Sequence, residues 1–315
     1  KGRQNYCPIG TITAVVLAEM RADGHEQVTH VRDEATGLEA VVAVHDTTLG
    51  PALGGTRILD YPTEEAALAD ALRLSRAMTY KAAAADLDLG GGKAVILGDP
   101  ADVKTEAALR AYGRAIDRLG GAYITAEDMN TAVADLDVVG EVTDHVVGTA
   151  DGLGDPSPVT AYGVEQGIRA AVAHRFGEET LERRSVLVQG VGKVGAELAT
   201  RLVDAGAEVK IADPREAACQ RVVEAAAGVA VVDVEDALTE SCDVLAPCAA
   251  SHLGLGSADA LETAIPNLEC EIVAGSANNA LGDHEEALDL ATRLDAAGIL
   301  YAPDYVVNAG GLILT

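Results

Sequence analysis

The amino-acid sequence predicts an α/β protein of two domains, the second built on a doubly wound parallel sheet. Its 315 residues are enough for about two domains of ordinary size. After Arg184, short apolar segments alternate with helical ones, as they do in parallel sheets covered by helices. The glycine- and proline-rich stretch 148–158 (GTADGLGDPSP) is the best linker candidate, so we predict domains at 1–148 and 149–315.

The first domain is predicted to contain strands and helices. Short segments rich in apolar residues and bounded by turn residues predict strands at 12–18, 38–45, 94–97 and 123–125. Apolar residues at spacings of three and four predict amphipathic helices at 64–79 and 105–118. Glu64 and Glu65 lie in the first turn of the earlier helix, where acidic side chains are favourable.

The second domain opens with a helix, for which Ser157 is the expected N-cap and Pro158 the first helical residue. The regular alternation follows. Strands are predicted at 185–190, 208–213, 229–232, 243–247 and 271–276. Helices are predicted at 193–206 and 215–227. This pattern is the basis for the doubly wound sheet.

The glycine pattern of Gly190, Gly192 and Gly195 joins a predicted strand to a predicted helix, which is the context of a Rossmann dinucleotide-binding turn. The glycines allow a tight turn, close approach of a pyrophosphate and close helix–strand packing. Asp213 ends the next strand, where a carboxylate can bind the ribose hydroxyls of NAD. Arg215 weakens that preference, because it could pair with the extra phosphate of NADP. The alternative is a turn that serves packing alone.

Composition excludes several classes of partner. The net charge is −27, from 50 acidic and 23 basic residues, which opposes binding to nucleic acid or to anionic membranes. Acidic residues are scattered along the chain and only six of the basic residues are lysine, which indicates a halophilic protein of a high-salt cytoplasm. That inference concerns habitat and solubility.

Cysteine and histidine usage indicates neither a disulfide framework nor a metal site. The five cysteines are odd in number and include no Cys-x-x-Cys pair, and the seven histidines show no metal-ligand spacing. The sequence contains no signal peptide and no apolar run long enough to span a bilayer. We therefore expect a cytoplasmic protein in a reducing environment.

Two of the six lysines, Lys81 and Lys93, are separated by a run of mostly small, apolar and glycine residues. Lys93 follows three glycines and precedes AVIL, which predicts an ammonium at the mouth of a strand beside backbone that a ligand can approach. A lysine whose pKa is lowered by burial can act as a base. The alternative is a pair of surface lysines on either side of a loop.

Seven segments, taken in order, resemble the Glu/Leu/Phe/Val amino-acid dehydrogenases, and within that family the leucine dehydrogenases. They cover essentially the whole chain and are highly specific together. The segments are GPALGGTR (50–57), MTYKAAAADLDLGGGKAVILGDP (78–100), ITAEDMNT (124–131), PSPVTAYGV (156–164), QGVGKVG (189–195), AGSANN (274–279) and APDYVVNAGG (302–311).

The resemblance implies oxidative deamination of an L-amino acid to a 2-oxo acid and ammonium, with reduction of NAD, in a cleft between a substrate-binding domain and the Rossmann domain. It implies that Lys93 is the catalytic lysine, that Asp128 exchanges protons with the amino group, and that Lys81 binds the substrate carboxylate. The remaining implied contacts are Gly54, Gly55 and Asn308 for the substrate, and Thr160 and Asn278 for the nicotinamide carboxamide. The implied cofactor-binding residues further include Lys193, Val194, Pro214, Ala249 and Asn308, beside the glycines and Asp213.

The resemblance also places Leu53, Met78, Ala126 and Leu312 around the substrate side chain. These residues are apolar, so a glutamate side chain would be left without a cation. A branched aliphatic amino acid (leucine, valine or isoleucine) is the first expectation. Phenylalanine is the second, because Leu312 departs from the valine usual in leucine dehydrogenases. A glutamate dehydrogenase and a non-catalytic dinucleotide-binding homologue remain alternatives.

The resemblance further implies a homo-oligomer assembled through the first domain. The sequence ends at GGLILT, in an apolar run, and the C-terminal helices of the family are missing from it. We therefore expect that more chain once followed, and a truncated, inactive relic of the enzyme is a further alternative.

Overall fold

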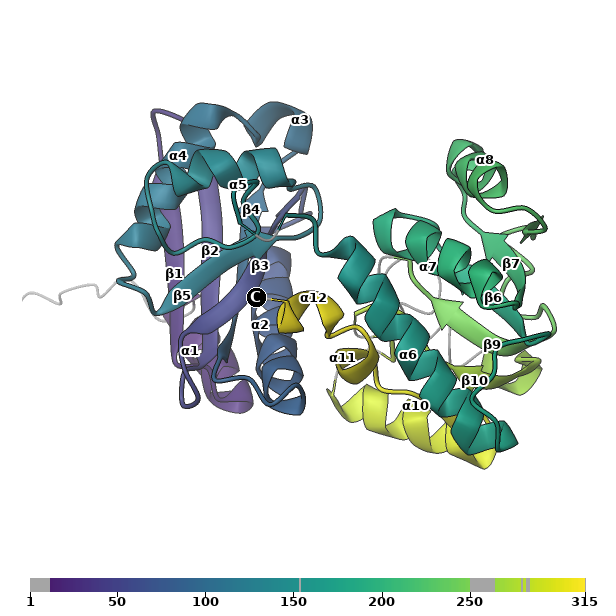
Figure 1. The fold of residues 1–315 in the computed structure, drawn as a ribbon. Coiled ribbons are helices and arrows are strands. Elements are labelled where there is room, and N and C mark those ends of the chain that lie inside the picture. The colour runs from purple at the N-terminus through teal and green to yellow at the C-terminus, as the bar shows by residue number, and fades with distance from the viewer. Residues whose placement is uncertain (1–11, 153, 250–263, 279, 282–283, 315) are drawn as a thin grey trace, which may run out of the picture. The chain divides into compact units, whose positions relative to one another are not determined.

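The computed structural model describes residues 12–152, 154–249, 264–278, 280–281 and 284–314 (Figure 1). The chain divides into two compact units, Lys1–Gly154 and Asp155–Thr315. This division lies six residues after the boundary predicted from the linker composition.

Unit 1 is built on a five-stranded sheet with the order β1-β2-β4-β3-β5. Strands β3, β4 and β5 are parallel, whereas β2 runs antiparallel to both β1 and β4. The strands are β1 (Gln27–Asp33), β2 (Leu38–Asp46), β3 (Ala52–Leu59), β4 (Gly90–Leu97) and β5 (Tyr123–Glu127).

The helices of unit 1 cover the two faces of this sheet. Residues of α2 such as Leu68 and Leu72 pack with Val95 of β4 on one face, and Leu109 and Tyr112 of α4 pack with β-strand residues on the other. Glu64 and Glu65 do begin α2, with Thr63 as its N-cap. The helices are α1 (Ile12–Asp23), α2 (Glu64–Ala84), α3 (Pro100–Val103), α4 (Glu106–Asp117) and α5 (Val133–Gly140).

Two predictions for unit 1 were wrong. The valine-rich segment 12–18 lies within helix α1, because Val16 and Met20, one helical turn apart, pack against the cluster formed by α2 and the sheet. Lys93 does not lie at the mouth of a strand: β4 begins at Gly90, so the three glycines belong to the strand and Lys93 is its fourth residue.

The glycines of β4 serve close packing within unit 1. A Cβ on Gly91 would lie 2.2 Å from the backbone nitrogen of Thr79 and 2.3 Å from the carbonyl oxygen of Ser75, both on α2. A Cβ on Gly92 would lie 2.5 Å from the ring of Tyr123. These two glycines therefore allow β4 to pack closely against helix α2 and against the ring of Tyr123 on β5.

Unit 2 is a doubly wound parallel sheet, as predicted. Its six strands have the order β11-β10-β9-β6-β7-β8, and all of the described pairs are parallel. The strands are β6 (Ser185–Gln189), β7 (Glu208–Ala212), β8 (Ala230–Val231), β9 (Cys242–Pro247), β10 (Cys270–Val273) and β11 (Leu300–Tyr301).

The first helix of unit 2, α6, begins at Ser157 itself, with Pro156 as the N-cap. Ser157 was predicted to be the N-cap, but its backbone N–H donates to Asp155 Oδ1 at 2.9 Å, so Asp155 supplies the capping oxygen. The helical segments of unit 2 are α6 (Ser157–Phe176), α7 (Lys193–Asp204), α8 (Glu216–Ala225), η1 (Ile265–Asn267), α10 (His284–Ala296), α11 (Asp304–Val307) and α12 (Gly310–Ile313). Among the described residues, no helix combines the length and the apolar character that crossing a membrane requires.

Candidate active site and nucleotide-binding turn

One face of the unit 1 sheet carries the predicted catalytic residues. Side chains alternate between the faces of a strand, so Leu53, Gly55 and Arg57 of β3 share a face. The register sets Gly55 beside Ala126 of β5 and places Lys93 on the other side of Gly55. Asp128 follows β5 directly and, two residues beyond Ala126, lies on this face as well. We call it the site face.

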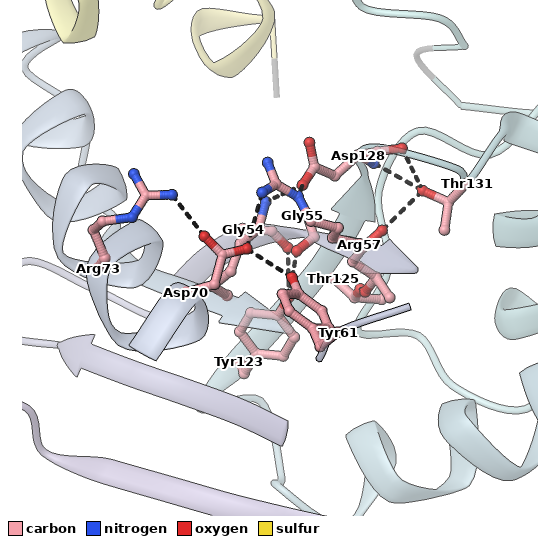
Figure 2. A network of polar contacts seen from close by, with 12 residues as sticks. Gly54, Gly55, Arg57, Tyr61, Asp70, Arg73, Tyr123, Thr125, Asp128 and Thr131 are labelled. Carbon is pink, nitrogen blue, oxygen red and sulfur yellow. Dashed lines mark hydrogen bonds and ion pairs between the residues drawn. The ribbon is translucent and has the colours of Figure 1, made fainter. Parts of the chain in front are cut away.

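Lys93 and Asp128 meet on the site face. The ammonium of Lys93, 5% exposed as a residue, donates to Asp128 Oδ2. Arg57 Nε donates to the same oxygen at 3.1 Å. Two cations therefore converge on a single carboxylate oxygen, and in Figure 2 the second oxygen of Asp128 points away from Arg57.

Glycine at position 55 makes this meeting possible. Lys93 and Asp128 come from the strands on either side of β3, so their side chains reach each other over Gly55. A Cβ on Gly55 would lie 2.5 Å from the carbonyl oxygen of Glu127 and 2.7 Å from Asp128 Cβ. Gly54 faces the opposite way, where a Cβ would lie 1.7 Å from the carbonyl oxygen of Gly92. Gly55 thus leaves room on the site face, while Gly54 allows close strand packing.

The loop that carries Asp128 is fixed to β3. The backbone N–H of Asp128 donates to Thr131 Oγ1 at 2.8 Å, and that hydroxyl donates to the carbonyl oxygen of Thr56 at 2.9 Å (Figure 2). Asn130 adopts a left-handed conformation (φ 62°) and donates from Nδ2 to the carbonyl oxygen of Ile58 at 2.8 Å. The carboxylate is therefore held in place by its own loop.

The environment shifts the ionisation of both catalytic candidates. Burial lowers the pKa of Lys93, and the positive charge of Arg57 lowers it further, although Asp128 opposes both effects. Burial would by itself raise the pKa of Asp128, but Lys93 and Arg57 hold it well below its ordinary value. The cation that contributes to the lowered pKa of Lys93 is thus Arg57.

Lys81 lies in the last turn of α2 and is half-buried, with Met78 three residues earlier on the same helix. Leu53 is 4% exposed and Ala126 is half-buried, and both belong to the site face. The proposed pocket residues of unit 1 are therefore apolar, with Leu53 on β3, Ala126 on β5 and Met78 on α2.

Sequence reasoning missed a network of charged residues behind Asp128. Arg57 Nη1 donates to Asp70 Oδ2 at 2.9 Å, and Tyr61 OH donates to the same oxygen at 2.6 Å. Arg73 Nη2 donates to Asp70 Oδ1 at 2.6 Å. Arg57 stood in the quoted segment GPALGGTR, which was the only signal for it. Asp70 lies on α2, and the packing of this helix on the sheet brings Asp70 to Arg57.

In unit 2, the turn between β6 and α7 has the shape that a dinucleotide requires. Gly190 has a φ of +91°, and a Cβ on it would lie 2.5 Å from the backbone nitrogen of Ala249. A Cβ on Gly195 would lie 2.0 Å from the carbonyl oxygen of Gly190. Gly192, the N-cap of α7, has no atom within 4 Å of its Cβ position, which leaves its backbone open to a pyrophosphate. The residues present therefore fit a dinucleotide.

Asp213, which follows β7, is already paired with Arg215. The Arg215 backbone N–H and Nε each donate to Asp213 Oδ1 at 2.9 Å, and Nη2 donates to Oδ2 at 2.8 Å. The backbone N–H of Val191 donates to Oδ2 at 2.9 Å, which ties the carboxylate to the glycine turn. The hydrogen bonds from Arg215 lower the pKa of Asp213 to about 2. Pro214 and Lys193 are exposed, Val194 is half-buried, and Lys193 Nζ lies 3.8 Å from Asp155 Oδ2.

A second group of predicted residues comes together near α12. Asn308 Nδ2 donates to Asn278 Oδ1 at 2.9 Å and to the carbonyl oxygen of Ser276 at 3.1 Å. Asn308 Oδ1 is buried and has no hydrogen-bond partner within the described part of the chain. Thr160 Oγ1 donates to the carbonyl oxygen of Pro156 at 3.0 Å, and a Cβ on Gly311 would lie 2.6 Å from that hydroxyl. Leu312 is buried on α12.

Comparison with known proteins agrees with this fold. The Glu/Leu/Phe/Val dehydrogenase dimerisation domain matches residues 25–145. Leucine dehydrogenase of Bacillus subtilis is 48% identical over 292 residues, which are 92% of this chain and 77% of that protein. Valine dehydrogenase of Streptomyces virginiae is 50% identical over 295 residues, which are 92% of this chain and 80% of that protein.

Solved structures give the same result. The crystal structure of L-tryptophan dehydrogenase from Nostoc punctiforme is 42% identical, with a TM-score of 0.72, and the match covers 94% of this chain and 82% of that one. A hetero-hexameric glutamate dehydrogenase from Thermus thermophilus shares the fold at 22% identity and a TM-score of 0.72 over 99% of this chain and 83% of that one. Fold and site together define a nicotinamide-dinucleotide-dependent oxidoreductase acting on CH–NH₂ donors. The chain belongs to the Glu/Leu/Phe/Val dehydrogenase family.

Proposed function

We propose that this protein oxidatively deaminates an apolar L-amino acid with NAD, and that leucine, valine and isoleucine are its best substrates. The balanced reaction converts amino acid, NAD⁺ and water to 2-oxo acid, ammonium, NADH and a proton, and it is reversible. The observation that carries the proposal is the buried pair of Lys93 and Asp128, which meet over Gly55. A base and a carboxylate within reach of one substrate are what this chemistry needs.

Three residues of unit 1 have different roles in the reaction. Lys81 binds the substrate carboxylate, and Asp128 exchanges protons with the substrate nitrogen. Bound NAD supplies an acceptor for the hydride on the substrate Cα. Lys93, in its neutral form, takes a proton from the water that attacks the resulting iminium carbon. The lowered pKa of Lys93 favours this neutral form at moderately alkaline pH.

In unit 2, Gly190, Gly192 and Gly195 would hold the pyrophosphate, and Asp213 the adenine ribose. We propose NAD in preference to NADP because the Asp213 carboxylate would repel a 2′-phosphate. Thr160, Asn278 and Asn308 would hold the nicotinamide end. The buried Asn308 Oδ1, which has no hydrogen-bond partner among the described residues, supports a polar ligand there.

Substrate preference is proposed from Leu53, Met78, Ala126 and Leu312, which offer no positive charge to a side-chain carboxylate. A glutamate side chain would therefore be left unpaired in an apolar environment. Phenylalanine is the second candidate. One methylene in such a pocket changes discrimination by only about 1–3 kcal/mol, so several aliphatic substrates should be accepted.

The test is an absorbance assay at 340 nm with a panel of amino acids, NAD and NADP at high salt. We expect NADH to form with leucine or valine at alkaline pH, and the 2-oxo acid to be aminated with ammonium. Lys93→Ala should lose both reactions while still binding NADH, with Lys104→Ala as a control lysine of the same unit. Full activity in Lys93→Ala would refute the role of Lys93, and inactivity of the wild type with every amino acid would refute the function.

We also propose a homo-oligomer assembled through unit 1, which contains the segment that matches a dimerisation domain. Size-exclusion chromatography with light scattering measures the assembly directly. A monomer at micromolar concentration and high salt would refute the proposal.

A further inference from the structure

Arg57 occupies the centre of the charged network on the site face. Its Nε contacts Asp128 at 3.1 Å, and its Nη1 contacts Asp70 at 2.9 Å, so one guanidinium joins the catalytic carboxylate to helix α2 (Figure 2). Arg57 is 8% exposed. Because a buried charge without a partner is strongly unfavourable, Arg57 and the two aspartates all need oppositely charged partners. Burial would by itself lower the pKa of Arg57, but the two aspartates hold it above its ordinary value.

Other side chains also hold Asp70 in place. Tyr61 and Arg73 donate to its two oxygens at 2.6 Å each, and the side chain of Asp70 is only 14% exposed. Arginine suits this position because its planar fork can pair with two carboxylates that lie in fixed directions, whereas a lysine ammonium is a compact point charge. Asp70 therefore fixes the orientation in which Arg57 meets Asp128.

The network has a consequence for the reaction. When Lys93 loses its proton, it ceases to neutralise the buried charge of Asp128. Arg57, which contacts the same oxygen, remains as a counter-ion, so Asp128 can stay ionised. Without Arg57 the pair would hold its proton more tightly, because a buried carboxylate without a cation is strongly unfavourable.

We propose that Arg57, oriented by Asp70, is a positioning residue that keeps Asp128 ionised and in place while Lys93 gives up and regains its proton. This inference rests on the proposed function, in which neutral Lys93 is the base. It assigns a role in turnover to four residues outside the predicted site: Arg57, Tyr61, Asp70 and Arg73.

The test uses two variants that should shift the pH dependence in opposite directions. Deamination needs neutral Lys93, so its kcat/KM rises with pH through the pKa of Lys93. Arg57→Gln removes a positive charge that lowers this pKa, so the rising limb should move to higher pH. Asp70→Asn removes a negative charge that raises it, so the limb should move to lower pH. At a fixed pH on this rising limb, we expect kcat/KM of Arg57→Gln to be about tenfold lower than that of the wild type.

Controls separate this role from a structural one. Arg57→Lys keeps the charge and should leave the limb near its wild-type position, although kcat falls because one of the two contacts is lost. Arg110→Gln removes a half-buried arginine of unit 1 that pairs with Glu106 and Glu141, and it should leave the limb unchanged. Limbs that do not move, or that move in the same direction for Arg57→Gln and Asp70→Asn, would overturn the proposal.

A second measurement does not depend on turnover. Competitive acetylation of Lys93 by acetic anhydride, followed by peptide mass spectrometry across pH, reports the ionisation of its amine. The same opposite shifts are expected in the folded variants, and equal titration of Lys93 in all of them would overturn the proposal. Wild-type turnover with leucine is measured first, so that failure of the proposed function is recognised separately. If Arg57→Gln does not fold, Asp70→Asn and Arg57→Lys still decide the question.

Discussion

At the scale of single residues, an arginine pairs with each of two carboxylates: Arg57 with Asp128 and Arg215 with Asp213. Lys93 and Asp128 were each predicted to be catalytic, and the structure brings them into direct contact. Arg57 was not predicted, because its role depends on two carboxylates that lie 13 and 71 positions away in the sequence. Arg215 was predicted as a residue that could pair with the extra phosphate of NADP, yet in the structure it pairs with Asp213.

Arg215 gives a prediction about cofactor choice. In the structure it donates to both oxygens of Asp213, the carboxylate that would accept the ribose hydroxyls. Arg215→Ala should therefore favour NADH further and weaken NADPH binding about tenfold or more, since a charged hydrogen bond is worth about 1.5–3 kcal/mol. Titration of each cofactor by its fluorescence measures the effect, with exposed Arg221→Ala on α8 as the control. Unchanged NADPH binding would contradict it.

At the scale of elements, the prediction succeeded where periodicity and burial coincide. The strands and helices of unit 2 follow the predicted alternation because its sheet is buried on both faces and its strands are apolar. Strand β1 was not predicted, since it is an edge strand with mostly exposed or half-buried polar residues. Strand β3 was missed because it contains two adjacent glycines, and glycine weakens any strand signal.

Those glycines give a prediction at the same scale. In Gly55→Ala the new methyl group would meet Glu127 and Asp128, so the end of β5 has to shift and carry Asp128 with it. We expect kcat/KM to fall about 100-fold, because a displacement of about 1 Å has that effect on positioned groups. NADH binding by unit 2 should remain.

Gly140→Ala is the matched control for this variant. Its new Cβ would make only ordinary contacts, 3.5 Å from Thr149 and Val146, so activity should stay within about twofold. Equal kinetics for Gly55→Ala and wild type would show that Asp128 does not depend on the space at Gly55.

At the scale of the whole molecule, the dominant property is a net charge of −27 on 315 residues. A field of this size destabilises the folded chain through self-repulsion, and salt screens it. The Debye length falls from about 10 Å at 0.1 M to about 3 Å at 1 M salt. The charge was fully readable from the sequence, whereas its effect on stability depends on how closely the acidic groups approach one another after folding.

We therefore predict that the melting temperature rises with KCl concentration between about 0.1 and 2 M. The physical reason is the screening of repulsion among acidic groups, so a neutral osmolyte such as sucrose should produce a smaller effect. Differential scanning calorimetry in both series provides the comparison. A melting temperature that is constant or falls with KCl would contradict the high-salt interpretation.

The shared oxygen of Asp128 has a consequence for how this enzyme can evolve. Direct contacts join four charged residues: Lys93, Asp128, Arg57 and Asp70. A substitution at one of them alters the environment of the others, so they can change only together. Leu53 and Ala126 stand on the same face but contribute no polar group. Mutation can therefore reshape them one at a time, and new amino-acid preferences can arise while the proton chemistry is inherited intact.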